Sequence, residues 1–448
     1  MKINIPGYVS ELMEALYNSG FEAYIVGGCV RDALMGRTPK DYDITTNALP
    51  EDIKKCFSKY RTILIGEKHG TVAVVSAGNT VEITTYRIDG DYSDNRHPNN
   101  VQFTSDISFD LSRRDFTVNA MAYSAKSGLI DLFGGMEDIQ NKILRCVGRP
   151  EKRFEEDALR IMRALRFSSE LGFEIEEKAQ NAMLSLKENL DSISKERIFT
   201  ELSKMLCGEN VKSVLCKFAD IITTVIPELK ESVDFDQKNI HHCYDVYTHS
   251  AHVVKNCPGD LALKWAALLH DSGKPQCFFM GEDGQGHFYG HSAKSAEIAE
   301  AVLTRLKSST VLKKLVCELI MIHDRAIVNT DRSIKRFLKA VSPEAADRIF
   351  DLKIADNASL APAYHTRIQG LEETCMRMRE IILSKECVSE KQLQIDGNDL
   401  IKLGAPQGKM VGVLKNTLLD LVIDGKVENT KPELELVAKK LILELRND

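Results

Sequence analysis

Residues 26–44 read VGGCVRDALMGRTPKDYDI, and this stretch decides the fold of the first part of the chain. The apolar run over residues 23–26 predicts a strand, the glycine pair predicts a tight turn, and residues 30–35 predict a helix. A second strand is predicted over residues 41–44. A turn without side chains between a strand and a helix lets phosphate groups approach backbone N–H groups.

Asp41 and Asp43 are the residues of this stretch that predict chemistry. On a strand, side chains two residues apart point to the same side, so both carboxylates would converge. Two close carboxylates repel each other unless a hard divalent cation lies between them. Glu82, on the second arm of a predicted hairpin over residues 71–75 and 81–85, can add a third. Three acids around Mg²⁺ suit in-line phosphoryl transfer, although an isolated pair at this spacing is more often a solvated turn.

The pattern around this stretch predicts a mixed α/β head followed by helices. Residues 9–19 predict an amphipathic helix, and residues 86–100 are polar without apolar periodicity, which predicts an irregular loop. A long helix over residues 153–171 is predicted to stop at Gly172. Further helices are predicted at 176–190, 195–206, 245–257, 261–270, 292–306, 310–323, 331–340 and 343–356.

Two further motifs follow in the head, LSRRDFTVNAMA at residues 111–122 and IDLFGG at residues 130–135. Together with the opening stretch they resemble the head of class II CCA-adding enzymes and bacterial poly(A) polymerases. The resemblance implies a polymerase-β-like nucleotidyltransferase fold. By motif position it implies the following roles: Gly28 and Arg31 hold the triphosphate, Asp41 and Asp43 bind Mg²⁺, and Arg114 contacts the nucleotide. Glu82 is the candidate third carboxylate, with Asp115 close to it in the motif.

Residues 156–166, EDALRIMRALR, place Asp157, Arg160, Arg163 and Arg166 at steps of three. One interpretation is a ladder of ion pairs along a helix, each worth only tenths of a kcal/mol. The other is base selection. A carboxylate accepts from the exocyclic amine of cytosine or adenine and an arginine donates to the adjacent ring acceptor, whereas uracil and guanine present a carbonyl. The resemblance assigns base reading to Asp157 and Arg160, and supporting nucleotide contacts to Arg163 and Arg166.

Residues 86–103, YRIDGDYSDNRHPNNVQF, are similar to the family's flexible loop, which helps the switch from C to A addition. CC-only relatives have a shortened loop, so its presence favours an enzyme that also adds A. A loop without any role is the alternative.

A second candidate centre lies in the helical part, at LLHDSGKP, residues 268–275. Histidines and aspartates on stacked helices can converge on a divalent metal. The motif resembles HD-domain phosphohydrolases, and the resemblance implies Mn, Ni, Co, Fe or Mg as the metal, with an inactive HD fold as the alternative. His241, His242 and His287 are expected to be surface or loop residues. The implied ligands are His249, His270, Asp271 and Asp356, with His291 and His323 for a second ion.

Composition sets the remaining expectations. The 448 residues carry a formal net charge of -6, so an RNA partner needs a local basic face rather than a basic chain. The candidates are the Lys and Arg clusters at 307–314, 332–339 and 431–440. The eleven cysteines form no C-x-x-C pair, which suits a reducing compartment, and no apolar run is long enough to span a bilayer. A cytoplasmic protein without a membrane or a stable protein partner is expected.

We therefore expect an enzyme that adds CCA to the transfer RNA acceptor arm from CTP and ATP. A poly(A) polymerase, an A-only or CC-only enzyme, and an HD phosphohydrolase remain alternatives. The predicted organisation is an α/β head followed by an all-α neck, an HD-type body and a tail, with boundaries at 1–148, 149–207, 208–360 and 361–448.

Overall fold

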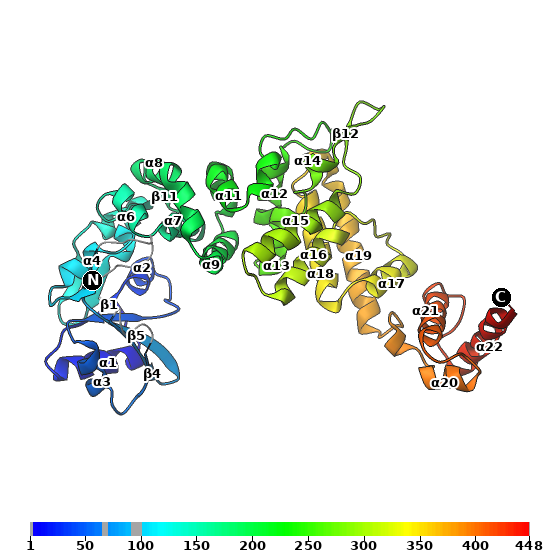
Figure 1. Cartoon of the computed structure of the whole chain (residues 1–448), viewed down its shortest axis with the longest axis horizontal. Coiled ribbons are helices and arrows are strands. Elements are labelled where there is room, and N and C mark those ends of the chain that lie inside the picture. The colour runs from blue at the N-terminus through cyan, green and yellow to red at the C-terminus, as the bar shows by residue number, and fades with distance from the viewer. Residues whose placement is uncertain (1–2, 65–69, 91–100, 448) are drawn as a thin grey trace. The chain divides into compact units, whose positions relative to one another are not determined.

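In the computed structural model, which describes residues 3–64, 70–90 and 101–447, the chain forms two compact units (Figure 1). They are Met1–Pro227 and Glu228–Asp448. The finer four-part division expected from the sequence stays a prediction. None of the helices in the described ranges is long and apolar enough to cross a membrane.

A seven-stranded sheet forms the centre of the first unit, in the order β3-β4-β5-β2-β1-β8-β9. Most neighbouring strands are antiparallel, but β2 and β5 run parallel. One face packs under α1 and α3, where Leu12, Leu16, Ile25, Ile44 and Ile53 are fully buried. The strands are β1 Ala23–Val26, β2 Asp43–Thr46, β3 Arg61–Leu64, β4 Thr71–Ser76, β5 Asn79–Thr85, β8 Met121–Ser124 and β9 Gly128–Asp131, and the head helices are α1 Gly7–Asn18, α2 Gly28–Leu34, α3 Pro50–Cys56, α4 Ile107–Ser112 and α5 Gly135–Asn141.

The first strand is confirmed as predicted, but the second begins two residues later than expected. The β1–β2 ladder starts with the pair Val26 and Asp43. Gly27 then turns the chain away with a φ of 81°, so Asp41 has no strand to pair with. Asp41 therefore precedes β2 rather than belonging to it.

The predicted irregular loop has paired ends. Strand β6, Arg87–Asp89, lies antiparallel to β7, Val101–Phe103. Residues 91–100, which carry the centre of the predicted C-to-A switching loop, lie outside the described residues.

The predicted single helix over residues 153–171 is wrong, because the structure divides it into α6, Pro150–Glu156, and α7, Leu159–Leu171. Asp157 interrupts it with an extended backbone, φ -145° and ψ 102°. The carboxylate of Asp157 accepts from the Leu159 N–H at 3.0 Å, which gives the second helix its own start. Gly172 ends α7 with a φ of 73°, as predicted.

Four more helices complete the first unit, and a short parallel ladder joins β10, Ile143–Leu144, to β11, Glu174–Ile175. A 3₁₀ segment, Lys187–Ser192, takes up the end of the helix predicted over residues 176–190. The helices are α8 Glu177–Leu186, α9 Lys195–Leu206, α10 Val211–Lys217 and α11 Ala219–Val225.

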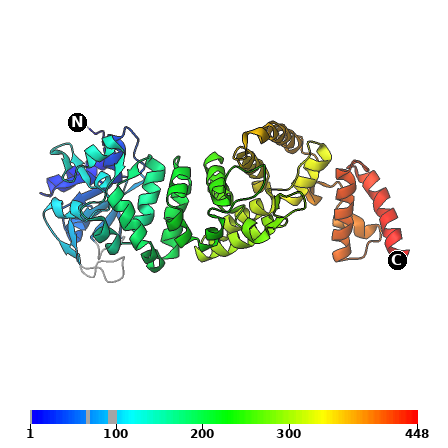
Figure 2. The same ribbon diagram turned by 90° about the horizontal axis from the view of Figure 1, so that it is seen from above.

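The second unit is helical (Figure 2), and the chain's single tryptophan, Trp265, is fully buried in it. A small hairpin of β12, Phe279–Met280, and β13, Gly286–His287, interrupts the helices. Helix α19, Thr366–Leu383, was not predicted from the sequence. The other helices are α12 Val246–Asn256, α13 Leu261–Leu269, α14 Lys274–Cys277, α15 His291–Arg305, α16 Thr310–Ile322, α17 Asp331–Ala340 and α18 Pro343–Asn357.

The last three helices, α20 Gly397–Lys402, α21 Lys409–Ile423 and α22 Lys431–Asn447, share an apolar core of their own. Several basic residues expected as RNA contacts form ion pairs here. Arg332 and Arg336 both lie 2.8 Å from Asp424, Lys339 lies 2.6 Å from Asp420, and Lys431 lies 2.9 Å from Asp399.

Candidate functional sites

The parallel ladder between β2 and β5 places two of the three predicted acids side by side. Asp43 and Glu82 are direct partners in the register, and both residues are exposed. Loss of hydration in the folded chain raises the pKa of Asp43 to about 6; the carboxylates of Glu82 and Asp41 add to this and Arg114 opposes it. Three acids that disfavour each other's charge are relieved by a divalent cation with oxygen ligands, so this donor set fits Mg²⁺.

The three acids Asp41, Asp43 and Glu82, here called the acidic edge, do not yet form a compact group of ligand atoms. Among the described residues, groups of three ligand atoms within 4.8 Å of one another occur only around Asp271. The ligand oxygens of Asp41, Asp43 and Glu82 are therefore not all within 4.8 Å of one another.

The glycine turn after β1 faces the second motif of the head. A Cβ at Gly27 would lie 3.1 Å from Nη1 of Arg114, and its φ is positive, so both sterics and backbone favour glycine. Gly28 begins α2 directly. Arg114 is held by the fully buried Asp110, which accepts from Nη2 at 3.2 Å. Arg114, the predicted nucleotide contact, therefore lies against Gly27, the residue directly before the predicted triphosphate-binding residue Gly28.

Arg31 links α2 to α7. Its Nη1 donates to Oδ1 of Asn119 at 2.6 Å, and Nε donates to Asp32 at 2.8 Å. Its guanidinium carbon lies 5.1 Å from the ring centre of Phe167, which also contacts Arg166 at 4.1 Å. Arg163 lies 5.3 Å from the same ring centre, so a single aromatic ring packs against three of the predicted nucleotide-binding arginines.

Asp157 and Arg160, the predicted base-reading pair, lie on either side of the helix break but bond to other groups. Asp157 accepts from Nη2 of Arg197 at 2.9 Å. Arg160 donates to Glu156 at 2.7 Å and to the carbonyl of Arg113 at 3.0 Å. The alternative, a ladder of ion pairs, is present in part, because Arg160 pairs with Glu156 and Arg166 with Glu170, each four residues away. Asp157 instead pairs with Arg197 of α9.

The next two arginines of this helix are also engaged. Arg163 lies 2.6 Å from Asp115, and Arg166 lies 3.2 Å from Glu201. Burial opposes the ionisation of Asp115, but Arg163 and Arg160 outweigh it and hold its pKa at about 2. Asp115 is thus an anchor for an arginine and lies in an ion pair, apart from the β2–β5 edge.

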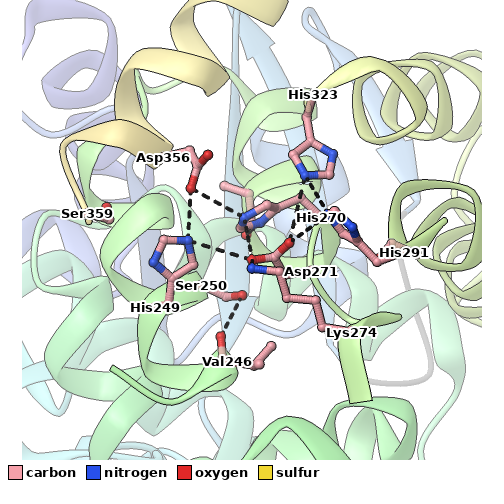
Figure 3. Close-up of polar contacts among 12 residues, drawn as sticks. Val246, His249, Ser250, His270, Asp271, Lys274, His291, His323, Asp356 and Ser359 are labelled. Carbon is pink, nitrogen blue, oxygen red and sulfur yellow. Dashed lines mark hydrogen bonds and ion pairs between the residues drawn. The ribbon is translucent and has the colours of Figure 1, made fainter. Parts of the chain in front are cut away.

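The second centre brings all six predicted ligands together, as Figure 3 shows. The carboxylate of Asp271 lies in the middle. Its Oδ2 is 3.2 Å from Nε2 of His270 and 3.7 Å from Nε2 of His249, and its Oδ1 is 3.4 Å from Nε2 of His291 and 3.7 Å from Nε2 of His323. Two groups of three potential ligands therefore share Asp271. Asp356 joins the first group, 2.9 Å from His249.

Three of the histidine rings are fixed in one tautomer. The Nδ1 atoms of His270, His291 and His323 lie 2.7–2.9 Å from the carbonyls of Ala267, Phe288 and Ile320. A carbonyl only accepts, so each Nδ1 carries the proton and each Nε2 offers a lone pair to the centre.

With its Nε2 atoms unprotonated, this arrangement is repulsive, and a bound cation removes the repulsion. The Nε2 atoms of His291 and His323 face each other at 3.3 Å, and Nε2 of His270 faces a carboxylate oxygen without a hydrogen bond. Lone pairs at such distances are stabilised by a divalent metal between them, so the residues fit one or two ions.

A pocket of about 280 Å³ opens over these groups. Lys274 lies in its wall, with Nζ 2.7 Å from Asp271. His242 is a loop residue as expected, but it lines the pocket together with His241 rather than facing away from it. Burial, with a contribution from Lys274, lowers the pKa of His242 to about 3. His287, 28% exposed, lies in the hairpin and pairs with Asp283.

Sequence reasoning missed several residues that hold these sites. Asp110 had a local signal, because it precedes Arg113 and Arg114 by three and four residues. Arg197 and Glu201 had none, since their partners are 40 and 35 residues away. Lys353 is equally hidden; its Nζ donates to the carbonyl of His323 at 2.6 Å.

Three family models match the chain in succession. The model described as "Poly A polymerase head domain" covers residues 23–145, and "Probable RNA and SrmB- binding site of polymerase A" covers residues 172–231. The "HD domain" model covers residues 239–360. The head-domain match contains the three acids of the first site, and the HD-domain match contains the six ligand candidates of the second.

Two relatives that match nearly the full length of the chain are both CCA-adding enzymes. A CCA-adding enzyme of Leuconostoc mesenteroides subsp. mesenteroides is 46% identical over 96% of this chain and 95% of its own, and one of Lactobacillus helveticus is 34% identical over 95% and 94%. The Bacillus stearothermophilus CCA-adding enzyme, solved with CTP, matches with a TM-score of 0.75 and 27% identity over 98% of both chains. A Thermotoga maritima CCA-adding enzyme solved with tRNA shares the fold, with a TM-score of 0.63 and 20% identity over 98% of this chain and 100% of its own. The chain belongs to the family of CCA-adding enzymes, the transfer RNA nucleotidyltransferases.

Proposed function

We propose that this chain adds CCA to the 3′ end of transfer RNA from CTP and ATP, without a nucleic-acid template. The observation that carries the proposal is the register of Asp43 with Glu82 beside the Gly27 turn, in a chain related over its full length to CCA-adding enzymes. The family depends on a divalent metal, and Mg²⁺ is the ion that the acidic edge fits best. A cytoplasmic location fits this role.

Asp41, Asp43 and Glu82 hold Mg²⁺ in this proposal. When bound, Mg²⁺ polarises the α-phosphate and stabilises the leaving pyrophosphate. Gly28 leaves room for the triphosphate at the start of α2, and Arg31 and Arg114 bind its oxygens with charge-assisted hydrogen bonds. The RNA 3′-hydroxyl loses its proton to solvent as its oxygen attacks the α-phosphorus. The bond from that phosphorus to the oxygen bridging it to the β-phosphorus breaks, and pyrophosphate leaves.

Asp157 and Arg160 select the base in this proposal. The carboxylate now bonded to Arg197 has to turn to the exocyclic amine of cytosine or adenine, and Arg160 has to leave Glu156 for the adjacent ring acceptor. Arg163 and Arg166, anchored by Asp115 and Glu201, support the nucleotide. Because selection uses one amine and one acceptor, the same pair admits both C and A.

Extension of three transfer RNAs tests the first function: one lacking CCA, one lacking CA and one lacking only the final A. Each is incubated with Mg²⁺ and CTP, ATP or both, and the product ends are sequenced. Addition that stops at CCA is expected. A ladder of A residues would identify a poly(A) polymerase, and a halt at CC or addition of the last A alone would identify an enzyme with half of the activity.

We propose a second function, hydrolysis of phosphate esters at the centre of His249, His270, Asp271 and Asp356, with His291 and His323 for a second ion. The facing lone pairs of His291 and His323 carry this proposal. Divalent transition metals such as Mn²⁺ or Ni²⁺ fit the nitrogen-rich ligand set, and when bound they supply Lewis acidity at the phosphorus. Water replaces the alcohol on phosphorus, and the alcohol leaves with a proton.

Three measurements test this second function: elemental analysis of the purified chain, release of phosphate from phosphomonoesters, and opening of 2′,3′-cyclic nucleotides to nucleoside monophosphates. Retained metal with metal-dependent hydrolysis is expected. A chain that binds no Mn²⁺ or Ni²⁺ would show that the HD fold is only structural.

A further inference from the structure

The pocket over the histidine centre is completed from outside the matched HD region. That match ends at residue 360, whereas Arg367, the second residue of α19, also lines the pocket. The pocket thus combines metal-ligand candidates of the HD region with a cationic side chain from the helix that follows it.

The guanidinium of Arg367 rests on an aromatic support. Its central carbon lies 4.9 Å from the ring centre of Tyr364, and that ring packs edge-on against His241 at 4.3 Å. The carbonyl of His241 in turn accepts from the N–H of Ala361 at 3.0 Å. A stacked guanidinium keeps its fork of N–H donors free in a fixed plane.

Arg367 has no acidic partner among the ion pairs of residues 3–64, 70–90 and 101–447. The other arginines of the same helix that face acids are paired: Arg377 lies 2.6 Å from Asp331, and Arg379 lies 2.8 Å from Asp347. An arginine beside a pocket without a carboxylate partner is available to an anionic ligand.

The other cations of the pocket wall are already committed. Nζ of Lys274 bonds to Asp271 at 2.7 Å and to Oε1 of Gln237 at 2.8 Å. Nζ of Lys353 donates to the carbonyl of His323 at 2.6 Å. Of the three basic side chains described in the wall, Arg367 is therefore the one whose N–H donors have no hydrogen-bond or ion-pair partner among the described residues.

The net charge of the pocket wall makes anion binding depend on bound metal ions. The wall holds three cationic side chains, Lys274, Lys353 and Arg367, against three carboxylates, Asp271, Asp324 and Asp356. The side chains alone balance, whereas bound divalent ions leave the pocket positive. A phosphate oxyanion would then be attracted both to the ions and to the guanidinium.

We propose that Arg367 is the phosphate-binding residue of this pocket, and that its ligand is a phosphate monoester no larger than a mononucleotide; this rests on the proposed metal centre. A pocket of about 280 Å³ has room for a ligand of that size. A monoester has three terminal oxygens, so the fork of Arg367 takes two and one remains for the metal side. A diester or cyclic phosphate has only two terminal oxygens and a single negative charge, so it binds the fork and the metal side more weakly.

Calorimetry with small probes tests the proposal on the full chain loaded with Mn²⁺. The probes are methyl phosphate and dimethyl phosphate, and the Mn²⁺ content of every sample is measured in parallel. The variants are Arg367→Gln, Arg367→Lys, Arg379→Gln as a matched control on the same helix, and Asp271→Asn as a metal-site control.

Methyl phosphate is expected to bind at least about tenfold more tightly than dimethyl phosphate, and Arg367→Gln is expected to weaken it by about tenfold or more. Its Mn²⁺ content stays at the wild-type value. Arg367→Lys does not restore the affinity, since an ammonium cannot form the fork, and Arg379→Gln leaves it unchanged.

Equal affinities in Arg367→Gln and Arg379→Gln, or equal binding of the two probes by the wild type, would overturn the assignment while the metal centre stands. A wild type that retains no more Mn²⁺ than Asp271→Asn would remove the metal centre itself, and this inference with it.

Discussion

The acidic edge of the head and the histidine centre of the second unit differ in how complete they are before any ligand binds. Asp43 and Glu82 are exposed, and Asp157 is bonded to Arg197. In the histidine centre, the side chains of His249, His270 and Asp271 are at most 2% exposed. In the proposed mechanism the residues of the first site therefore have to exchange contacts, whereas the candidate ligands of the second already lie together.

This difference matches what each site is proposed to hold. A site that takes C and then A needs groups that can turn from one partner to another, and internal ion pairs keep those groups satisfied in between. A site for fixed ions gains from rigid ligands, because the rings are already oriented by their Nδ1 bonds.

The largest expected effect is in the head. Asp41→Ala removes a ligand of the ion that stabilises the transferring phosphate, so nucleotide incorporation should fall by about 10³-fold or more. Single-turnover extension of a transfer RNA lacking CCA measures it. Far-UV circular dichroism should stay unchanged, because Asp41 is exposed and outside the strand. Retained incorporation would refute the metal role of Asp41.

A substitution in the histidine centre tests whether the two sites act independently. Asp271→Asn keeps a hydrogen-bond partner for Lys274 but removes the charge shared by both ligand groups, so Mn²⁺ affinity should fall by about 10²-fold. Metal titration measures this. CCA addition should stay within about twofold of wild type. A parallel loss of CCA addition would show that the two sites act together.

A measurement of base selection tests whether Asp157 exchanges its contact with Arg197 for one with the base. Asp157→Ala should reduce discrimination against UTP by roughly 10²-fold while CTP incorporation falls less, because the acceptor for the amine is lost. Competition between CTP and UTP in a sequencing assay measures it. Arg197→Gln is the control, since it removes the present partner of Asp157 but keeps the carboxylate. The same loss of selectivity in both variants would indicate disturbed packing rather than base reading.

The smallest expected effect concerns Asp115, which anchors Arg163 of α7. Its pKa is lowered to about 2, so its ion pair stabilises the fold above the ordinary carboxyl value and the contribution is lost as the pH falls from about 4 through 2. Asp115→Asn should therefore lower the free energy of unfolding by about 2 kcal/mol at pH 7, and by less at pH 3.

Urea unfolding measures the effect of Asp115→Asn. Circular dichroism follows both units, whereas fluorescence follows the second unit alone, because Trp265 is the chain's single tryptophan. A loss of stability that does not change between pH 7 and pH 3 would contradict the ion-pair explanation.

The sequence predicted those parts of the sites that depend on local chemistry. The strand before Gly27 and the stop at Gly172 follow from neighbouring residues, and both are confirmed. The break at Asp157 was missed, because the Arg197 that holds its carboxylate lies 40 residues away and a helical pattern continues on both sides. The place of Arg367 was hidden in the same way, since only the folded chain brings the start of α19 to the histidines.

The parallel pairing of β2 and β5 also limits how such a chain can change its length. Asp43 and Glu82 are 39 positions apart, yet a single backbone register sets them beside each other. One residue inserted or deleted within β5 before Glu82 would turn its carboxylate to the opposite face of the sheet, however conservative the added residue. The turn at Ala77 and Gly78, where a Cβ on Gly78 meets nothing within 4 Å, has no such limit. Length variation that preserves activity is therefore expected at that turn, whereas within β5 evolution is restricted to substitutions.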